Sequence, residues 1–151
     1  MSMTKIVVGV DRSDGARAAL RFALDEARLH GAELHCVHVW QAPYAPISGA
    51  PVFLAGGLPE YEQGIAEDAQ HVVAEMLAEV GGTGGVTVHE HVVRGGPAHE
   101  LVEHARDAGL LVVGSRGHGG FAGLLLGSVS TQCVHHASCP VAVVHPPKKS
   151  G

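Results

Sequence analysis

Short apolar runs that alternate with helix-forming stretches most constrain the fold of this 151-residue chain. The first run, Ile6-Val7-Val8-Gly9-Val10, has no polar side chain, which is typical of strands covered on both faces in a parallel sheet. Residues 14–30 place apolar side chains at helical spacing, with Ser13 before them as an N-cap and Gly31 after them as a stop. We therefore predict an α/β fold, a doubly wound parallel sheet with right-handed crossovers. The strands are expected at residues 6–10, 33–40, 86–93, 110–113 and 141–144, and the helices at 14–30, 59–80, 97–108 and 131–136.

A glycine- and serine-rich segment follows the apolar run at 110–113. It begins with Gly114-Ser115-Arg116-Gly117 and ends with Gly127-Ser128-Val129-Ser130, just before the last predicted helix. Glycines Gly114, Gly117 and Gly127 let the backbone take positive φ and leave no Cβ in the way of a ligand, so that N–H groups can point at phosphate oxygens. The hydroxyls of Ser128 and Ser130 would lie in the first turn of the helix, whose N–H groups and dipole favour anions. The segment therefore predicts a phosphate site.

The spacing of these glycines excludes two familiar phosphate motifs. A Walker A loop needs a lysine, and this chain has none between Lys5 and Lys148. A dinucleotide fingerprint would place three glycines after the first strand, where the sequence reads Gly9-Val10-Asp11-Arg12-Ser13.

The pattern Gly114-x2-Gly117-x9-Gly127-Ser128, with residues 6–11 before it and 140–144 after it, closely resembles the universal stress protein family. The resemblance covers residues 5–144, and the complete glycine pattern is that of the ATP-binding branch. It implies a Rossmann-like five-stranded sheet of order 3-2-1-4-5, with helices on both faces. It also implies a homodimer formed through the last strand, residues 141–144.

In a doubly wound sheet, ligands bind at the carboxyl ends of the strands where the strand order reverses. With the implied order, Asp11 and Gly114 end the two strands that flank this point. The resemblance implies that Asp11 contacts the nucleotide and that the backbone of Val39 binds the adenine edge. From the residues alone, Asp11 could orient a ribose hydroxyl or a metal-bound water, or cap the following helix, and Val39 could be an ordinary core residue. The expected nucleotide-binding residues are Gly9, Val10, Asp11, Val39, Gly114, Ser115, Arg116, Gly117, His118, Gly119, Gly120, Gly127, Ser128, Val129 and Ser130.

Two side chains of the glycine-rich segment could pair with phosphate. These are Arg116 and His118, although an exposed position without a ligand role is equally open for both. Efficient phosphoryl transfer also needs a metal and a positioned nucleophile, and only parts of that set are legible. We expect no catalytic residue, and we predict a nucleotide-responsive regulator of stress adaptation that binds ATP with Mg²⁺ and hydrolyses it slowly or not at all. The alternatives are an interaction protein whose segment 41–58 docks a partner and whose nucleotide site is vestigial, or a cyclic AMP-binding member.

The twelve histidines suggest a metal site at first sight. His89 and His91 lie on one face of a predicted strand, and His135 and His136 are adjacent. No cysteine or carboxylate completes a ligand set with familiar spacing, so we predict scattered surface histidines and no metal site.

Charge and cysteine content limit the remaining classes. A net charge of −5 and a pI of about 6.1 argue against a nucleic-acid partner. No apolar run reaches the length of a membrane span, and the N-terminus lacks the apolar region of a signal peptide, so no membrane partner is expected. Three cysteines without C-x-x-C spacing indicate reduced thiols and a cytoplasmic protein. We predict one domain over residues 1–151, with a flexible tail at 146–151.

Overall fold

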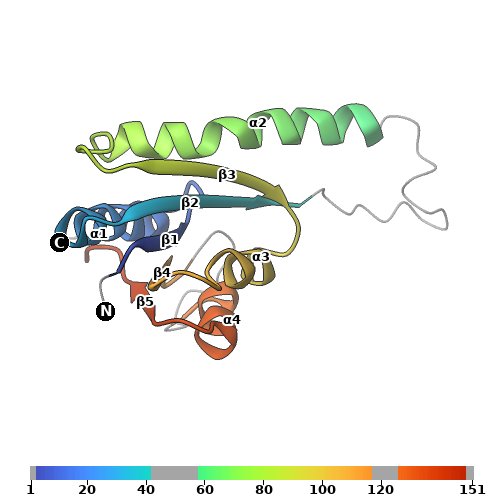
Figure 1. The fold of residues 1–151 in the computed structure, drawn as a ribbon. Coiled ribbons are helices and arrows are strands. Elements are labelled where there is room, and N and C mark those ends of the chain that lie inside the picture. The colour runs from blue at the N-terminus through green and yellow to red at the C-terminus, as the bar shows by residue number, and fades with distance from the viewer. Residues whose placement is uncertain (1–2, 42–57, 117–125, 149–151) are drawn as a thin grey trace.

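The protein is an α/β sandwich of a parallel sheet between two layers of helices (Figure 1). This computed structural model describes residues 3–41, 58–116 and 126–148. The sheet has the order β3-β2-β1-β4-β5, with all neighbours parallel, so the predicted fold class and strand order are confirmed. In chain order the elements are β1 (Lys5–Gly9), α1 (Asp14–His30), β2 (Glu33–Trp40), α2 (Leu58–Glu79), β3 (Val88–Arg94), α3 (Pro97–His104), β4 (Leu110–Gly114), α4 (Ser128–His136) and β5 (Val141–Val144).

Helices cover both faces of the sheet, because the side chains of each central strand alternate between two apolar cores. In β1, Ile6 and Val8 belong to the core beneath α1 and α2, whereas Val7 belongs to the core beneath α3 and α4. Figure 1 shows α1 and α2 on one side of the strands and α3 and α4 on the other. None of the helices that the structure describes is both long and apolar enough to cross a membrane.

Helix α1 is positioned by the caps that its sequence predicts. The Ser13 hydroxyl accepts a hydrogen bond from the Ala16 N–H at 3.1 Å. Gly31 ends the helix in the left-handed region, with φ of 65°, and its N–H donates to carbonyls of the last turn. The first turn of α1 is therefore held directly beside the end of β1.

Three predicted boundaries differ from the structure by two or more residues, and the other differences are of one residue. β3 begins at Val88, because Val86 closes a turn by donating its N–H to the Thr83 carbonyl at 3.1 Å. α3 ends at His104, since the Ala108 N–H donates to the Ala105 carbonyl in a tight turn. α4 begins at Ser128, three residues before the predicted start.

Candidate functional site

A pocket lies at the carboxyl ends of β1 and β4, where the strand order reverses. It encloses about 260 Å³. β1 connects outward to β2 on one side, and the chain returns to build β4 on the other, so within residues 3–41, 58–116 and 126–148 no connection crosses the gap between their ends. The predicted residues that line the pocket are Gly9, Val10, Asp11, Val39, Gly114, Arg116, Gly127, Ser128, Val129 and Ser130.

One end of the pocket presents main-chain groups of Val39. Successive residues of a parallel strand direct their N–H and C=O groups to opposite neighbours, and the Val37 carbonyl accepts from the Val10 N–H at 2.9 Å. Val39 therefore faces the β1 side as well, but β1 has already ended at Gly9. The Val10 carbonyl would be the next acceptor for β2, but it accepts a hydrogen bond from Nδ1 of His38 at 2.8 Å instead of one from the Val39 N–H. The Val39 N–H and C=O are thus directed into the pocket as an adjacent donor and acceptor.

The turn between β1 and α1 places Asp11 at the pocket wall. Its Oδ1 accepts from the Ser13 N–H at 2.8 Å, which leaves the second carboxylate oxygen for another partner. Ser13, and not Asp11, caps α1 through its hydroxyl. Asp11 therefore orders the turn that precedes the helix and does not cap the helix itself.

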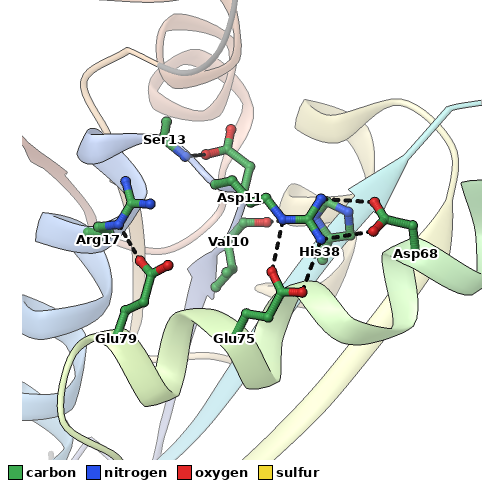
Figure 2. A network of polar contacts seen from close by, with 9 residues as sticks. Val10, Asp11, Ser13, Arg17, His38, Asp68, Glu75 and Glu79 are labelled. Atoms are coloured by element: carbon green, nitrogen blue, oxygen red, sulfur yellow. Dashed lines mark hydrogen bonds and ion pairs between the residues drawn. The ribbon is translucent and has the colours of Figure 1, made fainter.

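A network of charged side chains anchors this turn to α2 (Figure 2). The Arg12 guanidinium donates to Asp68 at 2.8 Å and to Glu75 at 3.0 Å, and Arg17 pairs with Glu79 one turn further along. The hydrogen bond from Arg12 lowers the pKa of the Asp68 carboxyl, and its carboxylate partners raise the pKa of Arg12. These groups are largely exposed, so the network fixes orientation more than it stabilises the fold.

The opposite end of the pocket is the N-terminus of α4. Gly127 is its N-cap, and among the described residues no side chain caps the helix there and no acidic residue occupies its first turn. The first N–H groups of a helix have no intrahelical acceptor, and Ser128, Val129 and Ser130 all line the pocket. This end therefore offers hydrogen-bond donors and a positive dipole to an anion.

Gly114 and Gly127 do not take the positive φ that glycine allows. Gly127 has φ of −77°, and Gly114 is not among the glycines with positive φ. The requirement at Gly114 is steric instead. A Cβ atom there would lie 2.7 Å from the backbone carbon of Gly15, and one on Gly15 would lie 2.6 Å from the Arg116 carbonyl oxygen. The two glycines let the start of α1 pack directly on the end of β4.

A model of the universal stress protein family matches residues 3–145. The chain belongs to this family. A universal stress protein of Mycolicibacterium smegmatis is 41% identical over 143 residues, covering 93% of this chain and 47% of that protein. One of Methanocaldococcus jannaschii is 33% identical over 158 residues, covering 96% of this chain and 84% of that protein. The chain thus spans about half the length of the mycobacterial relatives.

Solved universal stress proteins share the architecture. One from Lactobacillus plantarum superposes with a TM-score of 0.79 at 26% identity, covering 95% of this chain and 99% of that one. A family member in complex with cAMP has a TM-score of 0.63 at 28% identity, covering 97% of this chain and all of that one. One from Archaeoglobus fulgidus in complex with dAMP has a TM-score of 0.61 at 27% identity, covering 95% and 99%. Some structural neighbours in the family therefore bind adenine nucleotides.

Among the described residues, one predicted site residue does not line the pocket of this family member: Ser115 is fully buried. The predicted residues Gly117, His118, Gly119 and Gly120 lie outside the described residues, as does most of segment 41–58. Sequence reasoning missed several residues that do line it: Ser13, Ala16, Val37, Pro97, Leu101 and Val113. Pro97 and Leu101 follow the third strand directly and are four residues apart, which is helical spacing. This signal could have indicated that the helix after the third strand forms a wall of the pocket.

The base of the glycine-rich segment is closed by main-chain hydrogen bonds. The Gly127 N–H donates to the Ser115 carbonyl at 2.6 Å, and the Ser115 N–H donates to the Val144 carbonyl at 2.9 Å. The buried Ser130 hydroxyl lies 3.0 Å from both the Ser115 and the Gly127 carbonyl oxygens. Its proton is therefore engaged inside the protein, and its N–H is the donor left for a ligand.

We expect Ser130→Ala to lower the free energy of unfolding by about 1 kcal/mol, because it removes the hydroxyl that ties Ser115 to Gly127. Urea denaturation measures this loss. Ser115→Ala is the matched control, since the Ser115 Oγ is buried without a hydrogen-bond partner among the described residues. Its removal should cost less than Ser130→Ala. Equal losses in the two variants would contradict this account of the segment's base.

Proposed function

We propose that the pocket binds an adenine nucleotide, ATP together with Mg²⁺, and that the protein is a cytoplasmic, nucleotide-responsive regulator of stress adaptation. One observation carries the proposal. A single pocket presents an adjacent main-chain donor and acceptor at Val39 and an uncapped helix N-terminus at Ser128. The first suits the edge of a base and the second suits a phosphate. The neighbours solved with cAMP and dAMP support the same ligand class.

The space between these two ends suits a nucleoside. Its walls include Val10, Val37, Leu101 and Val113, so the middle of the pocket is apolar. Small-molecule sites are commonly apolar with a few convergent polar groups, in volumes of roughly 300–1,000 Å³. The volume of about 260 Å³ lies just below this range, which fits a base and sugar with the phosphates extending along the start of α4.

The pattern at Val39 predicts a preference for adenine over guanine. Adenine presents an amino donor beside the N1 acceptor, which complements one C=O and one N–H. Guanine presents a carbonyl oxygen beside an N1–H donor, in the reverse arrangement. A mismatched base would leave buried polar groups unpaired on both partners, which is costly.

The residues present also fit Mg²⁺. The Asp11 carboxylate supplies a hard oxygen ligand at the pocket wall, with one oxygen uncommitted to the turn. Mg²⁺ is usually bound by one or two carboxylates together with substrate phosphates. Asp11 would hold the ion, which would neutralise phosphate charge.

Hydrolysis is proposed to be slow or absent. Arg116 is the cationic side chain that lines the pocket within the described residues, and no lysine lies there among them. Efficient phosphoryl transfer needs cationic clamps and a positioned nucleophile in addition to the metal. The proposed role is therefore occupancy-dependent regulation.

The proposed assembly is a homodimer through β5. This edge strand of four apolar residues is half-buried, so pairing with a second copy would cover an exposed strand edge. Light scattering in solution tests it, and a monomer mass would reject it.

Calorimetric titration of nucleotide-stripped protein tests the ligand. ATP, with and without Mg²⁺, should bind saturably at about one site per chain, and GTP should bind at least tenfold more weakly. Tight binding of cAMP with weak ATP binding would favour the cyclic AMP alternative. No saturation by any adenine nucleotide at millimolar concentration would reject the proposal in favour of an interaction protein.

A further inference from the structure

A histidine-rich cluster lies at the opposite end of the sheet from the pocket. Glu33 and His35 stand at the amino end of β2, and His89 and His91 stand at the amino end of β3. The register pairs His35 with His89, and residues two apart along a strand share one face. All four side chains therefore lie on the same face of the sheet. The sequence shows no carboxylate at a familiar metal-ligand spacing from His89. In the structure, Glu33 of the neighbouring strand supplies one.

We propose that Glu33, His35 and His89 form a binding site for a divalent transition metal of the Zn²⁺ type. Glu33 Oε2 lies 3.3 Å from His89 Nε2 and 3.8 Å from His35 Nε2. The three ligand atoms all lie within 4.8 Å of one another. A tetrahedral zinc ion with ligands at about 2.0–2.2 Å needs its ligand atoms roughly 3.4 Å apart. Small side-chain rotations would therefore bring the three atoms around one ion.

The donor set selects the class of metal. Two imidazoles and one carboxylate suit Zn²⁺ and its neighbours in the transition series, whereas Mg²⁺ and Ca²⁺ favour all-oxygen sites. Glu33 and His89 are exposed and His35 is half-buried, so an ion can enter from solvent. The fourth position would be taken by water.

A second layer of histidines orients the proposed ligands. His35 Nδ1 lies 2.8 Å from His91 Nε2, so an Nδ1–H on His35 that donates there leaves its Nε2 lone pair facing Glu33. The His35 ring stacks on His91 at 5.1 Å and on His89 at 4.5 Å. His91 in turn contacts His104, whose Nδ1–H donates to the Glu100 carbonyl at 2.8 Å. Metal-binding imidazoles are typically held by such a contact through the second ring nitrogen.

The surrounding charges allow a cation. Lys5 is the nearby positive group, and it pairs with Asp107 at 2.6 Å, which offsets its charge.

Zinc titration of tag-free, metal-stripped protein tests the proposal by calorimetry, with Co²⁺ absorption as a readout of tetrahedral coordination. We expect one ion per chain. Glu33→Gln, His35→Gln and His89→Gln should each weaken binding at least tenfold. His91→Phe keeps all three ligands and should weaken it about tenfold by releasing the orientation of His35.

The matched control is His30→Gln. His30 also faces a carboxylate, since its Nε2 lies 3.3 Å from Glu26 Oε2, but this pair has no second imidazole among the described residues. Its replacement should leave zinc affinity unchanged. Circular dichroism and urea denaturation of each variant establish that the fold is intact, independently of the nucleotide proposal. Failure of zinc to saturate the protein, or an equal loss in His30→Gln, would overturn the metal site.

Discussion

Ser128→Asp should reduce the affinity for ATP at least tenfold without weakening the fold. Ser128 is the first residue of α4, its side chain is exposed, and it lines the pocket. A carboxylate there would repel the phosphates that the helix N-terminus is proposed to bind, and tenfold corresponds to about 1.4 kcal/mol. The same charge interacts favourably with the helix dipole and should add roughly 0.3–1 kcal/mol to stability. Calorimetry and urea denaturation measure the two effects.

Ser128→Asp is informative because it should lower the affinity for ATP while it raises the stability of the fold. A general disruption of the site would lower affinity and stability together. Ser128→Asn is the matched control, because it has nearly the same shape and no charge. It should bind ATP within a few-fold of the unmodified protein. ATP affinity unchanged by the aspartate would show that phosphates do not lie at α4.

Gly114→Ala should lower the free energy of unfolding by about 3 kcal/mol, the upper end of the usual cost of overpacking. The new Cβ would lie 2.7 Å from the backbone carbon of Gly15, and backbone cannot move aside as a flexible side chain can. The start of α1 would have to shift away from β4, which would also displace Asp11 at the pocket wall. Urea denaturation followed by circular dichroism measures the loss.

Gly64→Ala provides the control of opposite sign. Gly64 lies within α2, and a Cβ there would meet nothing within 4 Å. Alanine should stabilise this helix by roughly 0.5–1 kcal/mol. If Gly114→Ala behaved like Gly64→Ala, the close packing of α1 on β4 would be refuted.

Local signals in the sequence were sufficient for much of the fold. The predicted bounds of α1, β2 and β5 agree with the structure, because caps, glycine stops and apolar periodicity are all encoded within a few residues. The strand order came from the family resemblance, since no local signal orders the strands. The crevice followed from that order, because the ends of β1 and β4 must then be adjacent.

Contacts between distant segments could not be predicted in the same way. The overlap that requires glycine at Gly114 depends on Gly15, which lies 99 residues earlier in the chain. The approach of Glu33 to His89 depends on the register of β2 against β3, which a single sequence does not specify. The burial of the Ser130 hydroxyl behind the pocket is also a tertiary property. The sequence alone therefore indicates a hydroxyl that faces a ligand, whereas the structure turns it into the protein.

Val39 contributes main-chain atoms to the pocket, and this has an evolutionary consequence. Any residue that keeps the strand extended supplies the same N–H and C=O, so drift at this position would leave the proposed base selectivity in place. Relatives with only about a quarter of their residues in common could therefore retain one ligand preference. The proposed selectivity would instead be lost by changes that move the backbone of β2 at this position.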